Sequence, residues 1–199
     1  MKKKVLVIVA HPDDETLWMG GTLIRNRNKW DVTLLVLTRK SDKDRYPKFL
    51  KVCKELNVKG YIYDLDDKNL KRPLDQKKIM TTILPHIKDK TYDLLFTHNS
   101  NGEYGHIRHK DIHKAITSAL KNNVLSSKKV FFFSYHKVNN KHQGYAEYNS
   151  SADIFIKLND NELSMKRKLA INVYGYDRGG IGFEELSAGP IEAFDKYAK

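Results

Sequence analysis

The segment from His11 to Glu15, His-Pro-Asp-Asp-Glu, places an imidazole and three carboxylates directly after a run of six apolar residues. Imidazole and carboxylate together are the usual ligands of a divalent metal ion of the zinc type. Adjacent side chains diverge, so Asp13 and Asp14 are not expected to bind the same ion. We therefore expect His11 and one aspartate to bind a metal, while the other aspartate takes a proton from a water molecule.

A second polar cluster contains His106, His109 and His113. Their spacings of three and four residues align them on one face if the segment is helical. A catalytic metal site needs three protein ligands and a water molecule. One or two of these histidines could therefore complete the site that begins with His11.

Each cluster also has an ordinary structural interpretation. A histidine at a strand end is often only hydrogen-bonded, and carboxylates before a helix can cap it and oppose its dipole. Histidines at helical spacing are often surface residues, and His113 fits that role as well as it fits a ligand. Two clusters of metal-ligand type at the ends of two predicted strands are hard to assemble by chance, so we favour a metal site.

The elements that must position these clusters alternate along the chain. Short β-rich runs and amphipathic segments follow one another, which is typical of parallel strands joined by crossover helices. Strands are expected at residues 4–10, 31–38, 60–65, 92–98 and 129–136. Helices are expected at residues 15–28, 46–56, 75–89, 109–122, 160–175 and 189–198. A glycine-rich segment separates the last two helices.

This alternation predicts an α/β protein with a Rossmann-like three-layer fold, in which helices flank a mostly parallel central sheet. We expect a single domain over residues 1–199, because this length can bury one core and no repeat or linker interrupts it. Ligands of such sheets gather outside the carboxyl ends of the strands, where both polar clusters lie. A dinucleotide site would need a glycine-rich turn after the first strand, and this chain has proline and carboxylates there.

Composition restricts the class of protein further. The chain has 36 Lys and Arg against 24 Asp and Glu, a net charge of +12, but the cations form small groups without interleaved aromatic residues. A solvated surface is therefore favoured, and no nucleic acid partner is expected. No apolar run is long enough to span a membrane. The single Cys53 fits a reducing compartment, so we expect a cytoplasmic protein.

The motif AHPDDE, followed far downstream by GHIRH, resembles the LmbE/PIG-L family of zinc-dependent deacetylases. The likeness extends through YDLLFTHNSNGEYGH and the late EAF. Enzymes of this family remove acetyl groups from N-acetylglucosamine units in varied conjugates. The resemblance implies an N-acetylated amino-sugar substrate, release of acetate and a free amine, and one Zn²⁺ or another divalent ion per chain.

The resemblance also implies a role for each residue of the two motifs. His11, Asp14 and His109 match the family's three zinc ligands, and Asp13 matches its general base. His106 matches the histidine that, when protonated, assists at the oxyanion or the leaving amine.

Further residues are assigned to the substrate. Arg45 lies where the family usually has an arginine that contacts the substrate. His98, Asn99 and Glu103, in the loop before GHIRH, are expected to bind the substrate or to fix the orientation of the imidazoles.

The chain departs from the family pattern at three places. Lys48 stands where glutamate is common, and Ile107 and Arg108 replace the proline and aspartate of the usual HPDH. YGYD, from Tyr174 onward, stands where YxSQ is common. These departures bear on the identity of the substrate more than on the chemistry, because the expected zinc ligands are intact.

Three alternatives stay open at this point. A related zinc amidase could remove a different acyl group or act on another conjugate. A basic α/β domain could bind nucleic acid, which salt would weaken steeply. A metal-binding relative could have lost hydrolysis, although the intact Asp13 argues against that.

Overall fold

The structure is a computed structural model, and it describes residues 1–88, 90–138, 145–176 and 187–197. Five parallel strands form most of its central sheet: β1 (Lys3–Val9), β2 (Trp30–Val36), β3 (Lys59–Ile62), β4 (Thr91–Thr97) and β5 (Ser126–Phe133). Two more strands, β8 (Ile154–Lys157) and β9 (Ile191–Lys196), extend it beyond β5. The strand order is β3-β2-β1-β4-β5-β9-β8, which confirms the predicted, mostly parallel sheet.

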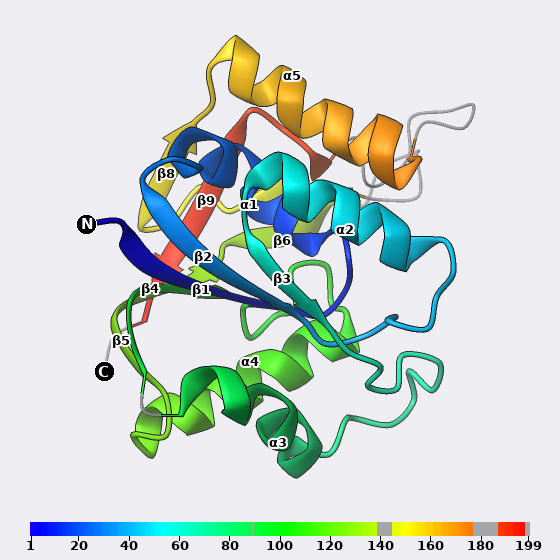
Figure 1. Ribbon diagram of the computed structural model, residues 1–199, viewed down its shortest axis with the longest axis vertical. Coiled ribbons are helices and arrows are strands. Elements are labelled where there is room, and N and C mark those ends of the chain that lie inside the picture. Colours follow the sequence, from blue (N-terminus) through cyan, green and yellow to red (C-terminus); the bar gives the residue numbers. More distant parts are fainter. Residues whose placement is uncertain (89, 139–144, 177–186, 198–199) are drawn as a thin grey trace.

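Helices cover both faces of this sheet (Figure 1). One face carries α1 (Asp14–Asn26), α2 (Arg45–Leu56), α5 (Asp160–Lys168) and the short π-helix η1 (Leu169–Tyr174). The other face carries α3 (Gln76–Ile87) and α4 (Ile107–Lys121). The predicted Rossmann-like arrangement of three layers is therefore confirmed.

The central strand β1 is buried on both faces, as is typical of a parallel sheet covered by helices. Val5, Val7 and Val9 pack with residues of α1, α2 and η1, whereas Leu6 and Ile8 pack with residues of α3 and α4. Its neighbours β2 and β4 are reached by crossovers that leave in opposite directions. The carboxyl ends of β1 and β4 therefore border a crevice of the kind in which such sheets bind ligands.

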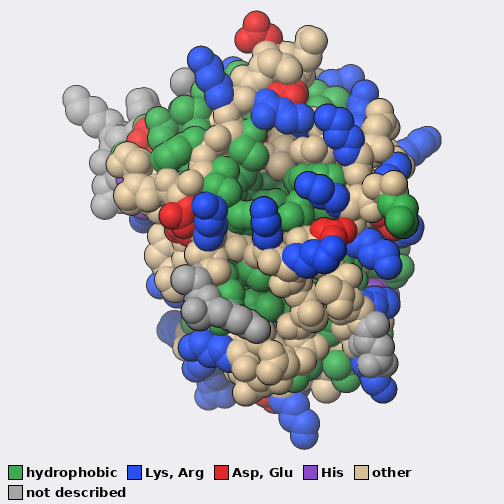
Figure 2. Space-filling model, turned by 90° about the vertical axis from the view of Figure 1, so that its left-hand side faces the viewer, with side chains coloured by type: hydrophobic (Ala, Val, Ile, Leu, Met, Phe, Trp, Pro, Cys, Tyr) green, Lys and Arg blue, Asp and Glu red, His purple; other side chains and the backbone are tan. Residues whose placement is uncertain are grey.

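The protein carries a net positive charge of +12. Figure 2 shows a face on which Lys and Arg side chains lie singly or in small groups between hydrophobic and uncharged ones. This distribution matches the scattered positive charge of the sequence. In the parts of the chain that the structure describes, no helix is long and apolar enough to cross a membrane.

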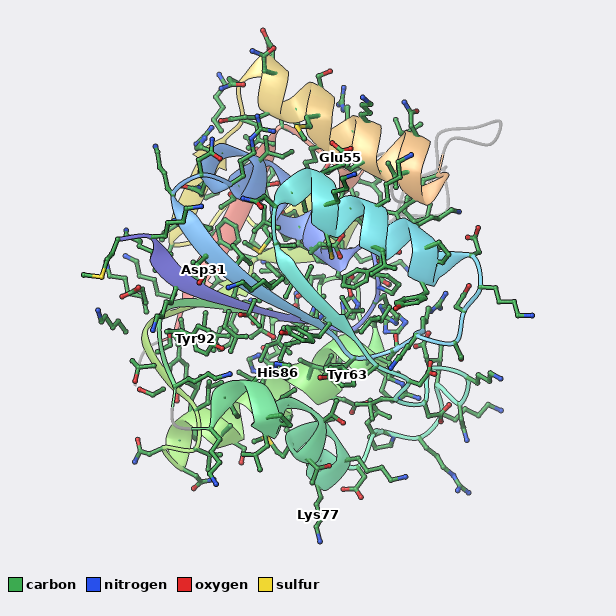
Figure 3. The ribbon with its side chains drawn as sticks, in the orientation of Figure 1. Asp31, Glu55, Tyr63, Lys77, His86 and Tyr92 are labelled. Atoms are coloured by element: carbon green, nitrogen blue, oxygen red, sulfur yellow. The ribbon has the colours of Figure 1, made fainter. Side chains whose placement is uncertain are left out.

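Helix α3 is fixed to the sheet by polar contacts of His86 as well as by apolar packing. The hydroxyl of Tyr63, just after β3, contacts His86 Nε2 (Figure 3). The hydroxyl of Tyr92, in β4, donates to the His86 carbonyl oxygen at 2.8 Å. The helix consequently continues past Pro85 as far as Ile87, as the sequence predicts within two residues.

The sequence prediction is wrong for the last part of the described chain. The pattern of residues 189–198 predicts a helix, but Ile191–Lys196 form β9, which pairs with both β5 and β8. The sequence also gives no sign of β8 or of the small antiparallel sheet formed by β6 (Tyr135–Val138) and β7 (Tyr145–Tyr148). These strands are short, and pairing with distant segments outweighs their weak local pattern. Most of the glycine-rich segment lies outside the described residues.

Glu192 of β9 supplies hydrogen-bond acceptors where the helical backbone of α1 is interrupted. Met19 has non-helical backbone angles, φ −149° and ψ 18°, so the amides that follow it need other acceptors. The Glu192 carboxylate accepts hydrogen bonds from Gly21 N at 2.8 Å and Thr22 N at 2.7 Å. It also forms an ion pair of 2.9 Å with Lys166 Nζ, and both of these side chains are fully buried. The part of α1 that follows the break is thereby tied to β9.

Glu192→Ala is expected to lower the free energy of unfolding by about 3–5 kcal/mol, because it leaves the buried Lys166 ammonium without its partner. Lys166→Met in the same chain should restore part of the loss, since it removes the unpaired charge. Urea unfolding followed by circular dichroism measures both variants. Equal losses in the single and the double variant would contradict a role for the ion pair.

Candidate active site

Three side-chain donor atoms from two distant segments meet at the carboxyl end of β1. His11 Nδ1 lies 3.3 Å from Asp14 Oδ2, and His109 Nε2 lies 3.4 Å from Asp14 Oδ1. The two imidazole nitrogens are 3.3 Å apart. All three residues are buried. The structure thus brings together the three residues that the sequence predicts as metal ligands.

The outward-facing nitrogen of each imidazole is held by a carboxylate. His11 Nε2 lies 3.0 Å from Asp67 Oδ1, and His109 Nδ1 contacts Glu103 Oε2. When the rings are neutral, these contacts place the N–H on the outward nitrogen and direct the lone pair of the other nitrogen toward Asp14. Two imidazole lone pairs and one carboxylate are the donor set of a catalytic site with three protein ligands. The residues present therefore fit a divalent metal ion.

The electrostatics favour a positive charge at the same point. Burial alone would lower the pKa of His11, but Asp14 and Asp67 raise it to about 10. Burial lowers the pKa of His109, which disfavours protonation of this ring. Burial would raise the pKa of Asp14, but His109 and His98 hold it well below its usual range. The cluster therefore contains an ionised carboxylate and favours a cation, either a proton on His11 or a metal ion.

Two donors fix the Asp14 carboxylate in place. Oδ2 accepts a hydrogen bond from His11 N at 2.7 Å. Oδ1 accepts one from the indole Nε1 of Trp18 at 2.9 Å, one turn further along α1. Because Trp18 is fully buried, the carboxylate cannot turn away without disrupting the core.

Asp13 lies beside this cluster in a strained backbone conformation. Its φ of 144° is rare for a residue with a Cβ atom and costs on the order of 1–3 kcal/mol. Its amide donates to Glu15 Oε2 at 3.1 Å, and its side chain makes no hydrogen bond to the helix N-terminus. The alternative that Asp13 is merely a helix cap is therefore wrong. Strain of this kind is concentrated at functional positions.

The Asp13 carboxylate lines the cavity and accepts hydrogen bonds from two side chains. Arg45 Nη1 donates to Oδ2 at 3.1 Å, and the Tyr176 hydroxyl donates to the same oxygen. The guanidinium also lies 5.0 Å from the centre of the Tyr176 ring. Burial and the neighbouring Asp14 raise the pKa of Asp13 to about 7, against the opposing effects of His11 and Arg45. A carboxylate with this pKa can accept and return a proton near neutral pH.

His106 is the N-cap residue of α4. Its Nδ1 accepts a hydrogen bond from Arg108 N at 3.2 Å, so in the neutral ring the hydrogen is on Nε2. Burial, His109 and His11 lower the pKa of His106 to about 3. In the resting site this ring is therefore a neutral hydrogen-bond donor.

His98 and Glu103 lie behind the ligands and have no access to a substrate, because both are buried. Glu103 Oε2 lies 2.9 Å from His98 Nδ1 and also contacts His109. His98 Nε2 accepts a hydrogen bond from Ala10 N at 2.9 Å, so this nitrogen is not available to a metal. The His98 ring stacks on the His109 ring with centroids 3.8 Å apart. Burial excludes direct substrate contact, and the contacts fit the other expectation, that these residues orient an imidazole.

Asn99 and His113 point away from the three donor atoms. Asn99 Nδ2 donates to Asp195 Oδ2 of β9 at 2.8 Å. His113 Nδ1 lies 3.0 Å from the His98 carbonyl oxygen, and its ring packs on Phe132. His113 thus lies outside the donor cluster, one helical turn beyond His109.

A cavity of about 130 Å³ opens onto the donor cluster. Arg39, Tyr104 and Tyr176 contribute to its lining in addition to the predicted residues. A larger groove of about 1070 Å³, lined mainly by the segment that follows β3, shares Arg39 with this cavity. A small pocket at the donor atoms is therefore continued by a wider polar surface.

The sequence analysis missed Asp67, Arg39 and Tyr176. Arg39 Nε donates to Asp67 Oδ2 at 2.8 Å, so the two form a pair behind His11. Both follow predicted strands, and the rule that ligands gather at strand ends could have found them. Tyr176 carries no comparable signal, because only the atypical YGYD segment marks it.

Comparison with known proteins identifies the family. The sequence pattern of the GlcNAc-PI de-N-acetylase family, PIG-L, matches residues 6–120, which is more than half of the chain. The matched region includes the three donor residues, Asp13 and His106. The chain belongs to this family.

Individual relatives are more distant. The chain is 29% identical over 131 residues to the uncharacterized protein L374 of Acanthamoeba polyphaga mimivirus, a match that covers 58% of this chain and only 57% of that protein. The crystal structure of the conserved protein TT1542 from Thermus thermophilus is similar with a TM-score of 0.69 at 16% identity, over 98% of this chain and 94% of the other. N,N'-diacetylchitobiose deacetylase from Pyrococcus horikoshii is similar with a TM-score of 0.60 at 16% identity, over 98% of this chain and 84% of the other. Likeness at such identities shows a shared fold.

His11→Ala and His109→Ala are each expected to weaken Zn²⁺ binding by more than about 100-fold, the upper range for changes outside the ligands themselves. The physical reason is the loss of one of three converging donor atoms. Competition with a coloured chelator measures the affinity. His113→Ala is the matched control and should bind Zn²⁺ like the wild type. Wild-type affinity in both test variants would show that the ligand assignment is wrong.

Proposed function

We propose that the protein is a metal-dependent N-deacetylase that hydrolyses the N-acetyl group of an N-acetylglucosamine-type sugar or conjugate to a free amine and acetate. Membership of the de-N-acetylase family supports this. The observation that carries the proposal is the meeting of metal-donor groups from three residues beside Asp13: each imidazole nitrogen of His11 and His109 lies 3.3–3.4 Å from an oxygen of Asp14. Zn²⁺ bound by His11, Asp14 and His109 would polarise the acyl carbonyl and lower the pKa of a water molecule.

Asp13 is the general base in this reaction. It takes a proton from the attacking water while the water oxygen forms a bond to the acetyl carbonyl carbon. The proton then passes from Asp13 to the amide nitrogen, the carbon–nitrogen bond breaks, and acetate and the amine leave. A pKa of about 7 suits both transfers, because the carboxylate is neither too weak a base nor too weak an acid.

His106 supplies a hydrogen-bond donor to the tetrahedral oxyanion. Its Nδ1 is occupied by the amide of Arg108, so the ring is held with Nε2–H as its free donor. A neutral donor fixed in advance stabilises developing negative charge without having to reorient during the reaction. This role needs no resting positive charge on His106.

The cavity favours a short acyl group over a long one. Its volume of about 130 Å³ is below the roughly 300–1,000 Å³ of typical ligand pockets. The acetyl group would enter it, and the sugar would lie across its mouth near Arg45 and Arg39. A zinc amidase that removes longer acyl groups is the alternative, and a panel of acetylated and longer-acylated amino sugars distinguishes the two.

A nucleic-acid-binding α/β domain is the alternative from another class. It would give oligonucleotide binding that weakens steeply with salt and needs no metal. The donor cluster has no role in that alternative, and on the face that Figure 2 shows the positive side chains lie singly or in small groups. We therefore favour the hydrolase. A cytoplasmic location is part of the proposal, in keeping with a single cysteine, Cys53.

The two adjacent aspartates are expected to respond differently to the same substitution. Asp13→Asn should keep Zn²⁺ but lose about 100- to 10,000-fold in acetate release, because the base is removed. Asp14→Asn should instead lose Zn²⁺ affinity. Metal content and acetate release from N-acetylglucosamine conjugates, with and without a chelator, are measured on both. Full activity of Asp13→Asn, or metal loss confined to that variant, would contradict the assignment.

Arg45→Lys is expected to raise KM for an N-acetylated sugar and to lower kcat, with metal content unchanged. Arg45 reaches both Asp13 and Tyr176 through Nη1, so the rest of its planar group can offer donors to a substrate, and lysine lacks this planar arrangement. Steady-state kinetics and elemental analysis measure these effects. Lys51→Met, an exposed change on the same helix, is the control. An unchanged KM for several active substrates would remove Arg45 from the site.

A further inference from the structure

Arg108 is a fully buried arginine directly before the proposed ligand His109. Its guanidinium does not reach the donor cluster. Nη2 donates to the carbonyl oxygen of Asn69 at 2.7 Å, and Nη1 donates to that of Arg72 at 2.9 Å. The first turn of α4 is thereby fastened to the segment between β3 and α3.

Asp111 adds a second connection between the same two segments. Its Oδ2 accepts hydrogen bonds from Leu74 N at 2.9 Å and from Arg108 Nη1 at 3.1 Å. Residues 69–74 are therefore held at both ends by one helical turn. We call Arg108 and Asp111 together the α4 clamp.

The segment held by the α4 clamp begins two residues after Asp67. The Asp67 carboxylate lies 3.0 Å from His11 Nε2 through one oxygen and accepts from Arg39 Nε through the other. The position of Asp67, and with it the orientation of the His11 ring, thus depends on where the clamped segment lies. Arg108 is thus connected to His11 in three steps: its hydrogen bond to Asn69, the short backbone link from Asn69 to Asp67, and the contact of Asp67 with His11.

We propose that Arg108 is a positioning residue for the metal site and acts through Asp67. This inference rests on the proposed metal-dependent function. His109 lies on α4 itself. His11 follows β1, and the orientation of its ring relative to the same helical turn is set through Asp67 and the α4 clamp. Both imidazole ligands are therefore oriented relative to one rigid element, which fixes the distance between their donor nitrogens.

Stability alone is a poor explanation for a buried arginine at this place. Removing a guanidinium from water is expensive, and well-packed apolar residues are often as stable as buried ion pairs. Arg108 Nε makes no hydrogen bond to any described residue, so the side chain is not fully satisfied. Its two Nη groups are used for two separate carbonyl oxygens, a fork that lysine cannot reproduce.

Zn²⁺ affinity in a double-mutant cycle tests the proposal without relying on catalysis. Asp67→Asn and Arg108→Met should each weaken Zn²⁺ binding by about 10- to 100-fold, as changes behind a ligating imidazole do. The double variant should be little weaker than either single one, because both changes interrupt the same contact chain. Lys114→Met, an exposed change on α4, is the control. Fully additive losses, or no loss in Arg108→Met, would overturn the proposal.

A second variant covers the case in which Arg108→Met does not fold. Arg108→Lys keeps the charge but loses the fork, and it should show a smaller loss of Zn²⁺ affinity together with faster amide hydrogen exchange in residues 66–74. Wild-type affinity in this variant would overturn the inference while leaving the proposed function intact. A wild-type protein that binds no Zn²⁺ would overturn both.

Discussion

The close approach of the donor atoms of His11, Asp14 and His109 is the constraint on which the rest of the site depends. Each imidazole nitrogen lies 3.3–3.4 Å from a different oxygen of Asp14, and the two nitrogens are 3.3 Å apart. Such atoms repel one another in a buried site unless a proton or metal ion lies between them. Side chains on the far side of each donor residue hold the donors in place against this repulsion. Asp67 holds the far side of His11, Glu103 holds that of His109, and Trp18 holds Asp14. The attraction for a cation is therefore built into the fold before any cation binds.

The sheet makes this convergence possible. His11 and His98 follow two neighbouring strands that are reached by crossovers in opposite directions, so the chain leaves a crevice between them. The turn after β1 must then be very tight, and Asp13 takes the strained φ of 144°. Glu15 stabilises the turn by accepting from the Asp13 amide and from the Tyr174 hydroxyl of η1. A helix late in the chain thus supports a turn near its beginning.

Hydrophobic periodicity predicts β1 to β5 and the first four helices because these elements bury continuous or one-sided apolar patterns. Residue type and position at strand ends predict a metal site with His11, one of the two aspartates and one or two of the later histidines, and only the resemblance to the deacetylase family narrows the proposed ligands to His11, Asp14 and His109. Periodicity fails for β9, whose strand geometry depends on partners far away in sequence. It also cannot predict that Asp67 reaches His11 across 56 positions, or that burial and neighbouring histidines keep His106 neutral. Those properties depend on distances that exist only after folding.

The separation of roles between Asp13 and Asp14 shows how such distances determine chemistry. The two side chains are identical and adjacent, and burial raises the pKa of both. For Asp14, His109 and His98 more than cancel this effect, so the carboxylate stays ionised and suited to a cation. For Asp13, the ionised Asp14 adds to the effect of burial, and the pKa reaches about 7. The proposed ligand therefore helps to create the proposed base: the negative charge that would attract a metal ion also makes its neighbour a stronger proton acceptor.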